Sequence, residues 1–442
     1  MFKHIARAVV FLAAVLAFAQ TDWKAGAAKL VITPKEPIWM AGFGFRDRPS
    51  EGIRQDIYVR ALALQDVSAK TFVLVTLDLA AVERQMSDAM AAQCLKRYGL
   101  SRDRLVLNVS HTHSGPVAGL VPMPLYDLTP AQRNVVRRYT AELIEKTADV
   151  VGIAIQNMAP ANLSFEQGLA GIAVNRRRVG RRSLPGPVDH DVPVLAVRAP
   201  EGKLRVVVVG YACHATMLSD YKISNDYPGY AREAIEKANP GALAMFVQGC
   251  GADSNAFPRA GEDLCQRRGD MLAAAVELVL KGKMKPVSGP LRGAFDRVDL
   301  PYHEMLTREE LQKRLEHKTK IYRTTARYLL DQLDRDGKFP NSCSCPIQVW
   351  RFGESLKFIV LGGEAVVDYS LRLKNQYGFD NTWVAGYSND VPAYIPSKRV
   401  VQEGGYEGGE ALVFFGRPGK FSAAVEEIIV EKVGDLMERT AH

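Results

Sequence analysis

Short apolar runs alternate with longer segments of helical periodicity along most of this chain. The apolar runs predict β-strands at residues 71–77, 105–109, 205–209, 243–247, 358–361 and 382–385. The helical patterns predict helices at residues 84–98, 130–157, 230–238, 262–280, 308–333 and 423–439. Alternation of this kind predicts an α/β fold, here a large mixed β-sheet flanked by helices.

Two segments refine this picture. Thr129 followed by Pro130 is typical of a helix start, because a threonine side chain accepts a free backbone amide and proline fits the first helical turn. The charged segment 308–338 interrupts the alternation of strands and helices. We interpret it as an exposed amphipathic helix, with an excursion over the functional site as the alternative.

The N-terminus has the pattern of a secretory signal peptide. Lys3 and Arg7 precede an apolar run at residues 8–18, which ends in small residues suited to cleavage before Gln20. The run is too short to span a bilayer. We therefore expect residues 1–19 to be removed, residues 20–442 to form one domain, and the protein to be secreted or periplasmic. A buried N-terminal helix is the alternative.

Composition excludes several classes of protein. The 442 residues are 47% hydrophobic, enough for a substantial core, which excludes disorder as the main state. The net charge is +8, but export and the lack of a binding motif argue against a nucleic-acid partner. We interpret the arginine cluster at residues 176–182 as a solvated loop, with an anion or lipid-headgroup contact as the alternative. The six cysteines are spread too thinly along the chain for a disulfide scaffold, and at most one or two bridges are expected. Cys343 and Cys345 are expected to pair with other cysteines or to remain thiols, because a bridge between them would be strained.

Polar residues follow the predicted strands at several points. The run Leu105 to Val109 delivers His111 and His113, and residues i and i+2 of an extended chain share a face. Neutral imidazole is a common zinc ligand, although two histidines hydrogen-bonded in a turn are the alternative. Other polar residues in this position are Asp78, His214, Asp253, Ser254 and Glu364. Ligands of α/β sheets bind outside the carboxyl ends of the strands, so we expect the site there.

Several motifs in order resemble those of the neutral (alkaline, non-lysosomal) ceramidases. They are HTHSGP at 111–116, VNR at 174–176, ACHATM at 212–217, GGE at 362–364, AYI at 393–395 and GYEG at 405–408. The resemblance runs from about Ala25 to the end of the chain, and the ordered set is more specific than any single motif.

The resemblance implies a site and a reaction. The implied Zn²⁺ ligands are His111, His214, Glu364 and Tyr394. The implied catalytic residues are His113, which moves a proton to the leaving amine, and Ser254 and Arg176, which contact the scissile amide. Zinc-activated water would then hydrolyse the N-acyl bond of ceramide, or of a related acyl amide, to a fatty acid and an amine. The expected partners are this substrate and, peripherally, a membrane or micelle surface, with no obligate protein partner.

Three features differ from the family pattern. The serine segment, residues 251–255, is one residue shorter than Gly-Asp-x-Ser-Pro-Asn, and Asn175-Arg176 continues with arginines instead of Ser-Pro. Full-length members also carry an immunoglobulin-like domain, which is not expected after Phe415. A zinc hydrolase acting on another amide or ester is therefore an alternative, as is a non-catalytic surface-binding protein. An acyl-chain groove is expected, with core packing as the alternative for its candidate residues Met217, Leu218, Tyr387, Val391, Pro392 and Ile395.

Overall fold

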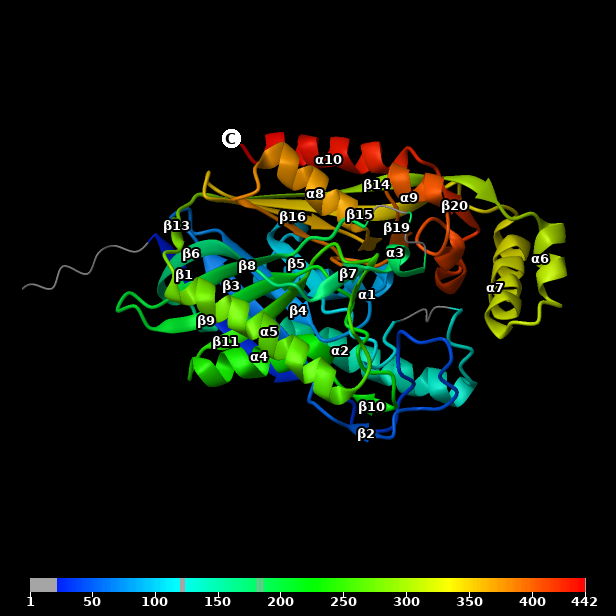
Figure 1. Ribbon diagram of the computed structural model, residues 1–442, viewed down its shortest axis with the longest axis horizontal. Helices are drawn as coiled ribbons and strands as arrows, with labels where there is room; N and C mark the ends of the chain where they lie inside the picture. The colour runs from blue at the N-terminus through cyan, green and yellow to red at the C-terminus, as the bar shows by residue number, and fades with distance from the viewer. Residues whose placement is uncertain (1–21, 120–123, 181–182, 184–185, 442) are drawn as a thin grey trace, which may run out of the picture.

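Two mixed β-sheets at the centre of the protein share one apolar core (Figure 1). The computed structural model describes residues 22–119, 124–180, 183 and 186–441. The predicted signal peptide, residues 1–19, lies outside these ranges. Side chains from both sheets, among them Leu62, Val106, Val208, Phe358 and Trp383, are buried together in the shared core. Burial of these two faces against each other is what holds the sheets in register.

The larger sheet has nine strands. Eight run in the order β11 (Leu243–Gln248), β9 (Leu204–Tyr211), β8 (Asp191–Arg198), β6 (Ala159–Leu169), β1 (Trp23–Val31), β3 (Tyr58–Gln65), β4 (Thr71–Leu77) and β5 (Leu105–Val109), and β13 (Lys285–Val287) pairs with β6. The pairs β4–β5 and β9–β11 are parallel, and the strands between them are antiparallel. The parallel pairs at the two ends are the part of this sheet that the apolar runs predicted.

The smaller sheet has five strands and packs on one face of the larger one. Its order is β18 (Thr382–Ala385), β16 (Leu356–Leu361), β15 (Ser342–Phe352), β14 (Leu291–Met305) and β20 (Gly419–Phe421). The pair β16–β18 is parallel and the other pairs are antiparallel. The predicted mixed sheet flanked by helices is thus confirmed, but the predicted strands are divided between two sheets.

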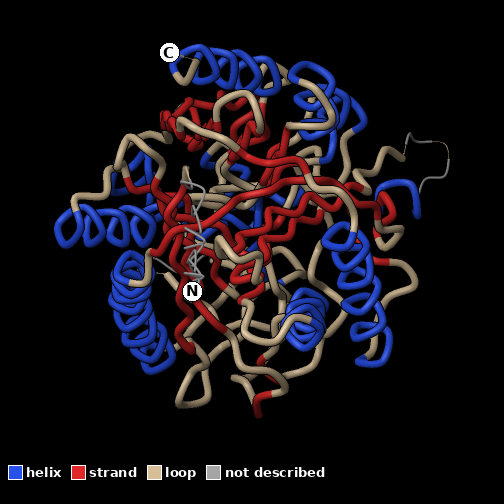
Figure 2. The backbone as a smooth tube through the Cα atoms, turned by 90° about the vertical axis from the view of Figure 1, so that its left-hand side faces the viewer, coloured by secondary structure: helices blue, strands red, loops and turns tan. Residues whose placement is uncertain are grey.

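Helices cover the outer faces, so that the strands lie inside (Figure 2). The larger sheet is covered by α1 (Arg84–Tyr98), α2 (Pro130–Gln156), α4 (Asp226–Ala238) and α5 (Glu262–Lys281), and the smaller by α8 (Val367–Tyr377) and α10 (Val425–Arg439). Helix α2 begins as predicted, because the Thr129 side chain accepts the Gln132 amide and Pro130 occupies the first turn. Among the described residues, no helix has both the length and the apolarity needed to cross a membrane.

The prediction of one helix over residues 308–333 is wrong. The segment forms two helices, α6 (Arg308–Arg314) and α7 (Lys320–Asp336), which bury Leu311, Ala326 and Leu329 in a small core of their own. Folding back lets two short amphipathic helices bury their apolar faces, which one exposed helix could not do. The α7 residue Thr325 donates a hydrogen bond of 2.9 Å to the carbonyl of Val413, in the 3₁₀ helix η2 (Glu410–Phe415).

Short elements complete the fold. Three two-stranded pairs are β2 (Gly52–Ile53) with β10 (Lys222–Ile223), β7 (Ala173–Asn175) with β12 (Ser254–Ala256), and β17 (Glu364–Ala365) with β19 (Tyr394–Ile395). The remaining helical turns are α3 (Arg176–Gly180), α9 (Lys398–Glu403) and η1 (Arg102–Arg104). All six cysteines are buried free thiols, so of the two expectations for Cys343 and Cys345 the unpaired thiols are confirmed.

Candidate metal and catalytic site

Asn108 links three strand ends beside the site through hydrogen bonds of its side chain. It lies in β5, the edge of the larger sheet, and its side-chain oxygen accepts the amide of Gln248 from the opposite edge strand β11, at 2.9 Å. Its side-chain amide donates to the carbonyl of Gly386 and the hydroxyl of Ser388, both at 2.9 Å, just after β18 of the smaller sheet. The carboxyl ends of strands from both sheets therefore meet at one place, as expected for the site.

His111 and His113 converge there, but not because the chain is extended. Strand β5 ends at Val109, and His111 has the left-handed φ of 56°. The extended-backbone explanation is thus wrong, since a turn and not a strand brings the two rings together. The ring centroids lie 4.8 Å apart and the two Nε2 atoms 3.1 Å apart. This strained conformation is typical of residues whose position matters for function.

The other three predicted ligands, His214, Glu364 and Tyr394, reach the same point from other strand ends. Strand pairing of β17 with β19 sets Glu364 beside Tyr394. The Glu364 Oε2 atom lies 3.2 Å from His111 Nε2 and 3.3 Å from His214 Nε2, and the Tyr394 hydroxyl lies 3.3 Å from His214 Nε2. The structure therefore brings together all four predicted ligands, with His113 beside them.

The hydrogen bonds of the two imidazoles fit a bound cation. Nδ1 of His111 lies 2.7 Å from the carbonyl of Ala80, and Nδ1 of His214 lies 2.7 Å from that of Gly251, so each Nδ1 carries the proton. Both Nε2 lone pairs are then directed at the Glu364 carboxylate with no proton between them. Ligand atoms bound tetrahedrally at about 2.0–2.1 Å from zinc lie about 3.3–3.4 Å apart, close to the separations found here. These residues fit a zinc ion, and His111, His113 and His214 alone form a group that can hold a metal.

Burial sets the protonation of these groups. Burial and the nearby charge of Arg176 lower the pKa of His214 to about 4. Burial also lowers the pKa of His113 well below 6.5. Burial opposes ionisation of Glu364, but His111 and His214 outweigh it and hold the pKa of that carboxyl well below its usual range. Burial and Glu364 raise the pKa of Tyr394 well above 10. Neutral imidazoles beside a carboxylate are the forms that bind metal.

Two residues of the arginine cluster form a buried charge network. Arg176 Nε donates to Glu407 at 2.7 Å, and its Nη2 donates to the Tyr394 hydroxyl at 3.2 Å. Arg177 donates to the other Glu407 oxygen at 2.8 Å and to Glu403 at 3.0 Å. The solvated-loop interpretation is thus wrong for Arg176 and Arg177, because acidic residues distant in sequence compensate their burial. Arg181 and Arg182 lie outside the described residues.

The predicted Ser254 is fully buried, and it does not line the cavity described below. Its carbonyl accepts the amide of His214 at 3.0 Å, while its hydroxyl has no hydrogen-bond partner among the described residues. The nearby Asp253 is structural, since it accepts the amide of Val367 at 2.9 Å and the side chain of Asn175 at 2.8 Å. A direct contact of Ser254 with substrate stays a prediction.

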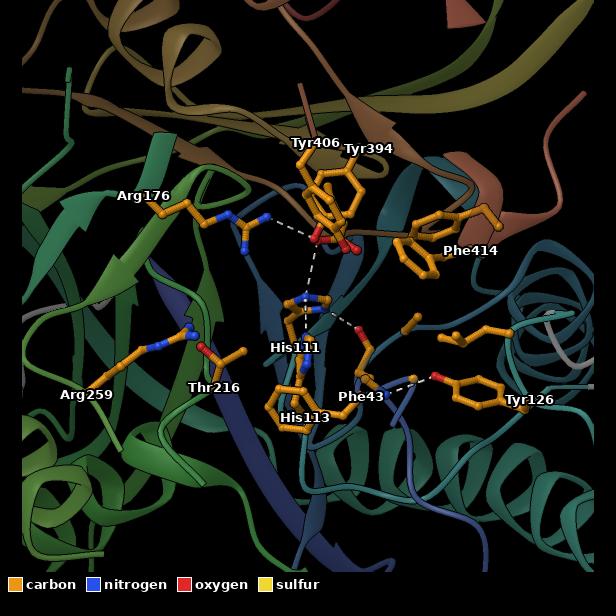
Figure 3. A pocket seen from close by; sticks show the side chains of 17 residues that line it. Phe43, His111, His113, Tyr126, Arg176, Thr216, Arg259, Tyr394, Tyr406 and Phe414 are labelled. Atoms are coloured by element: carbon orange, nitrogen blue, oxygen red, sulfur yellow. Dashed lines mark hydrogen bonds and ion pairs between the residues drawn. The ribbon is translucent and has the colours of Figure 1, made fainter. Parts of the chain in front are cut away.

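A cavity of about 280 Å³ opens above the histidines (Figure 3). Its walls include Phe43, Leu125, Tyr126, Arg176, Thr216, Arg259, Tyr406, Phe414 and Phe415, with His111, His113, Glu364 and Tyr394 among the remaining residues. The residues predicted for an acyl-chain groove lie elsewhere. Tyr387 is buried behind His111, with ring centroids 4.4 Å apart, and Val391 and Pro392 line a neighbouring cavity.

Sequence reasoning missed the aromatic wall. The backbone of Gly42 comes so close to His113 that an added Cβ would lie 2.3 Å from its ring, and the Phe43 ring stands edge-on at 4.9 Å. The alternation of glycine and phenylalanine at residues 42–45 is the signal that could have found this loop. The sequence around Tyr126 carries no such signal. Its side chain lies beside this loop because its hydroxyl accepts the amide of Gly42 at 2.9 Å.

Comparison with known proteins agrees with the motifs. The sequence model of the neutral/alkaline non-lysosomal ceramidase N-terminal region matches residues 23–290. The neutral ceramidase from Pseudomonas aeruginosa has a similar structure, with a TM-score of 0.75 at 19% identity over 96% of this chain and 76% of that chain. A structure described as ceramidase complexed with C2 gives 0.74 at 18% identity over 95% and 76%. At these identities the structures show a common fold. Since the family match spans more than half of the chain, the protein belongs to the neutral/alkaline non-lysosomal ceramidase family, which supports a ceramidase-like hydrolase.

Proposed function

We propose that the protein is a zinc-dependent amidohydrolase that cleaves the N-acyl bond of ceramide or of a related acyl amide. The observation that carries this proposal is the convergence of His111, His214, Glu364 and Tyr394 at separations of 3.2–3.3 Å, beside an aromatic-walled cavity. With two imidazoles and one carboxylate as ligands, a bound zinc ion would keep a net positive charge and would supply polarisation of an amide carbonyl and acidification of water.

The protein's own side chains have separate roles in this proposal. His113 lines the cavity, and its Nδ1 has no hydrogen-bond partner among the described residues, which leaves the ring available to pass a proton to the departing amine. Arg176 holds the Tyr394 hydroxyl in place and directs positive charge at the cavity, where an oxyanion would develop. The carbonyl of Ser254 accepts the amide of His214, and in this proposal Ser254 supports the position of that residue.

The proposal includes where the enzyme works. A secreted or periplasmic location follows from the predicted signal peptide. A lipid substrate requires peripheral contact with a membrane or micelle, and the Phe45 ring, which is 63% exposed and stacked on Phe43, would be available for it. No nucleic acid and no obligate protein partner is part of the proposed reaction.

The experiment combines metal analysis with a substrate panel. The purified protein is expected to contain close to one zinc per chain and to cleave N-acyl amides, with a chelator abolishing the activity. His111→Ala, His214→Ala and Glu364→Ala should each lose zinc and activity together. His113→Ala should keep zinc but lose about 10²-fold or more in rate. Full metal content in His111→Ala, or chelator-sensitive cleavage of esters alone, would contradict the proposal.

A further inference from the structure

Charge and apolar surface are segregated in the catalytic cavity. Its described lining residues include one carboxylate, Glu364, and two histidines, His111 and His113. The only lysine or arginine side chains among them are those of Arg176 and Arg259. Figure 3 shows both arginines, with Thr216, on one side of His111, and Tyr126 and Phe414 on the other. A substrate whose reacting carbonyl lies at the histidines would thus extend one arm toward cations and the other toward aromatic rings.

The two arginines differ in how their charge is balanced. Arg176 is compensated by Glu407, at 2.7 Å, which lies outside the cavity lining. Arg259 is exposed, and within the described part of the chain it forms no hydrogen bond or ion pair. It lies in the turn between β12 and α5. The cavity therefore contains a guanidinium with no counter-ion among the residues that the structure describes, and guanidinium binds carboxylate in a two-point geometry.

An acyl chain belongs on the aromatic side, because its burial there removes apolar surface from water. The amine portion then faces Arg259. We propose that this amine portion carries a carboxylate, so that the substrates are N-acyl amino acids. In the reaction the hydroxyl of water bonds to the acyl carbon, the C–N bond breaks, and the amine leaves with a proton, giving a fatty acid and a free amino acid. The inference rests on the proposed hydrolase function of the same site.

The test compares two amides that differ only in charge, N-lauroylglycine and N-lauroylglycinamide. We expect kcat/KM to be about tenfold higher for the carboxylate, mainly through KM, since hydrogen bonds to charged groups exceed neutral ones by this order. Arg259→Gln should abolish the preference by lowering kcat/KM for the carboxylate about tenfold more than for the carboxamide. Arg267→Gln is the matched control, because it removes an exposed arginine of α5 that does not line the cavity. High salt should weaken the preference of the wild type.

Binding of the same two amides, measured by calorimetry with EDTA present, separates this inference from the proposed function. Tighter binding of N-lauroylglycine that Arg259→Gln abolishes would support recognition of the carboxylate by Arg259. If ceramide were cleaved but neither of these amides were, the inference would be overturned and the hydrolase would stand, whereas failure to cleave any N-acyl amide would overturn the hydrolase. Equal binding and equal cleavage of the two amides would overturn the inference and leave the hydrolase intact. A carboxylate preference that persists in Arg259→Gln would also overturn it.

Discussion

Asp78 is expected to be the most sensitive buried charge outside the candidate site. It directly follows β4 and is 1% exposed, with Arg232 donating to both its oxygens at 2.7 and 2.8 Å and Arg60 donating at 3.2 Å. The amide of Tyr58 donates to the same carboxylate at 2.9 Å. We expect Asp78→Asn to destabilise the fold strongly, because the shape is kept while two buried arginines lose their only shared counter-ion among the described residues.

The magnitude follows from the geometry. Opposite charges about 4 Å apart attract by about 4 kcal/mol at an effective dielectric constant of about 20, and Asp78 makes two such pairs. Desolvation offsets part of this attraction, and breaking a buried pair by removing one partner costs about 3–5 kcal/mol. We expect a loss of this size in the free energy of unfolding, against a total of about 5–15 kcal/mol for a typical protein.

The assay is equilibrium unfolding in guanidinium chloride, with the midpoint expected to fall at an unchanged slope. Asp334→Asn is the matched control, since it breaks an exposed pair with Arg308, 2.7 Å long, and should leave the midpoint nearly unchanged. A loss below about 1 kcal/mol in Asp78→Asn, the range of exposed pairs, would refute the reasoning.

The pH dependence of this effect has a definite sign. Burial raises the pKa of Asp78, but Arg232 and Arg60 outweigh it, so the net pKa lies below the usual value. A depressed carboxyl pKa stabilises the fold above the unfolded value of about 3.9, and this stabilisation is lost as the pH falls through the folded pKa. The difference between wild type and Asp78→Asn should therefore be constant near neutrality and shrink only below about pH 4.

Three further substitutions probe the support of the site. Glu407→Gln should lower kcat with zinc retained and cost about 1–3 kcal/mol in thermal unfolding, because Arg176 loses its charged acceptor; unchanged kcat would argue against a positioning role. Tyr387→Phe should weaken zinc affinity about 10–100-fold in a chelator competition, since its hydroxyl donates to Glu364 at 3.4 Å. Gly42→Ala, at φ 92°, should displace His113 and lower activity about tenfold or more, whereas Gly171→Ala, with open space, should not.

The sequence by itself determined the elements whose signals are local. The strands at 71–77, 105–109 and 382–385 and the helix at 84–98 have the predicted bounds, because continuous apolar runs and helical periodicity need no distant partner to be recognised. The long antiparallel strands β6 and β14 were missed because they carry polar residues on partly exposed faces. Strand β15 was missed although most of it is buried, because serines, a proline and a glutamine interrupt its apolar residues. The histidine motifs could likewise be recognised in the sequence, because a metal site requires particular residue types.

Only the tertiary structure decided how these pieces form a site. The four candidate ligands come from the carboxyl ends of strands in two different sheets, and Asn108 links these sheets through hydrogen bonds with Gln248 and Ser388. Nothing local to Arg259 or Phe414 indicates that both line one cavity. Local sequence sets the preferred conformation of the backbone, whereas the direction of a side chain and its neighbours depend on which apolar faces are buried against each other across hundreds of residues.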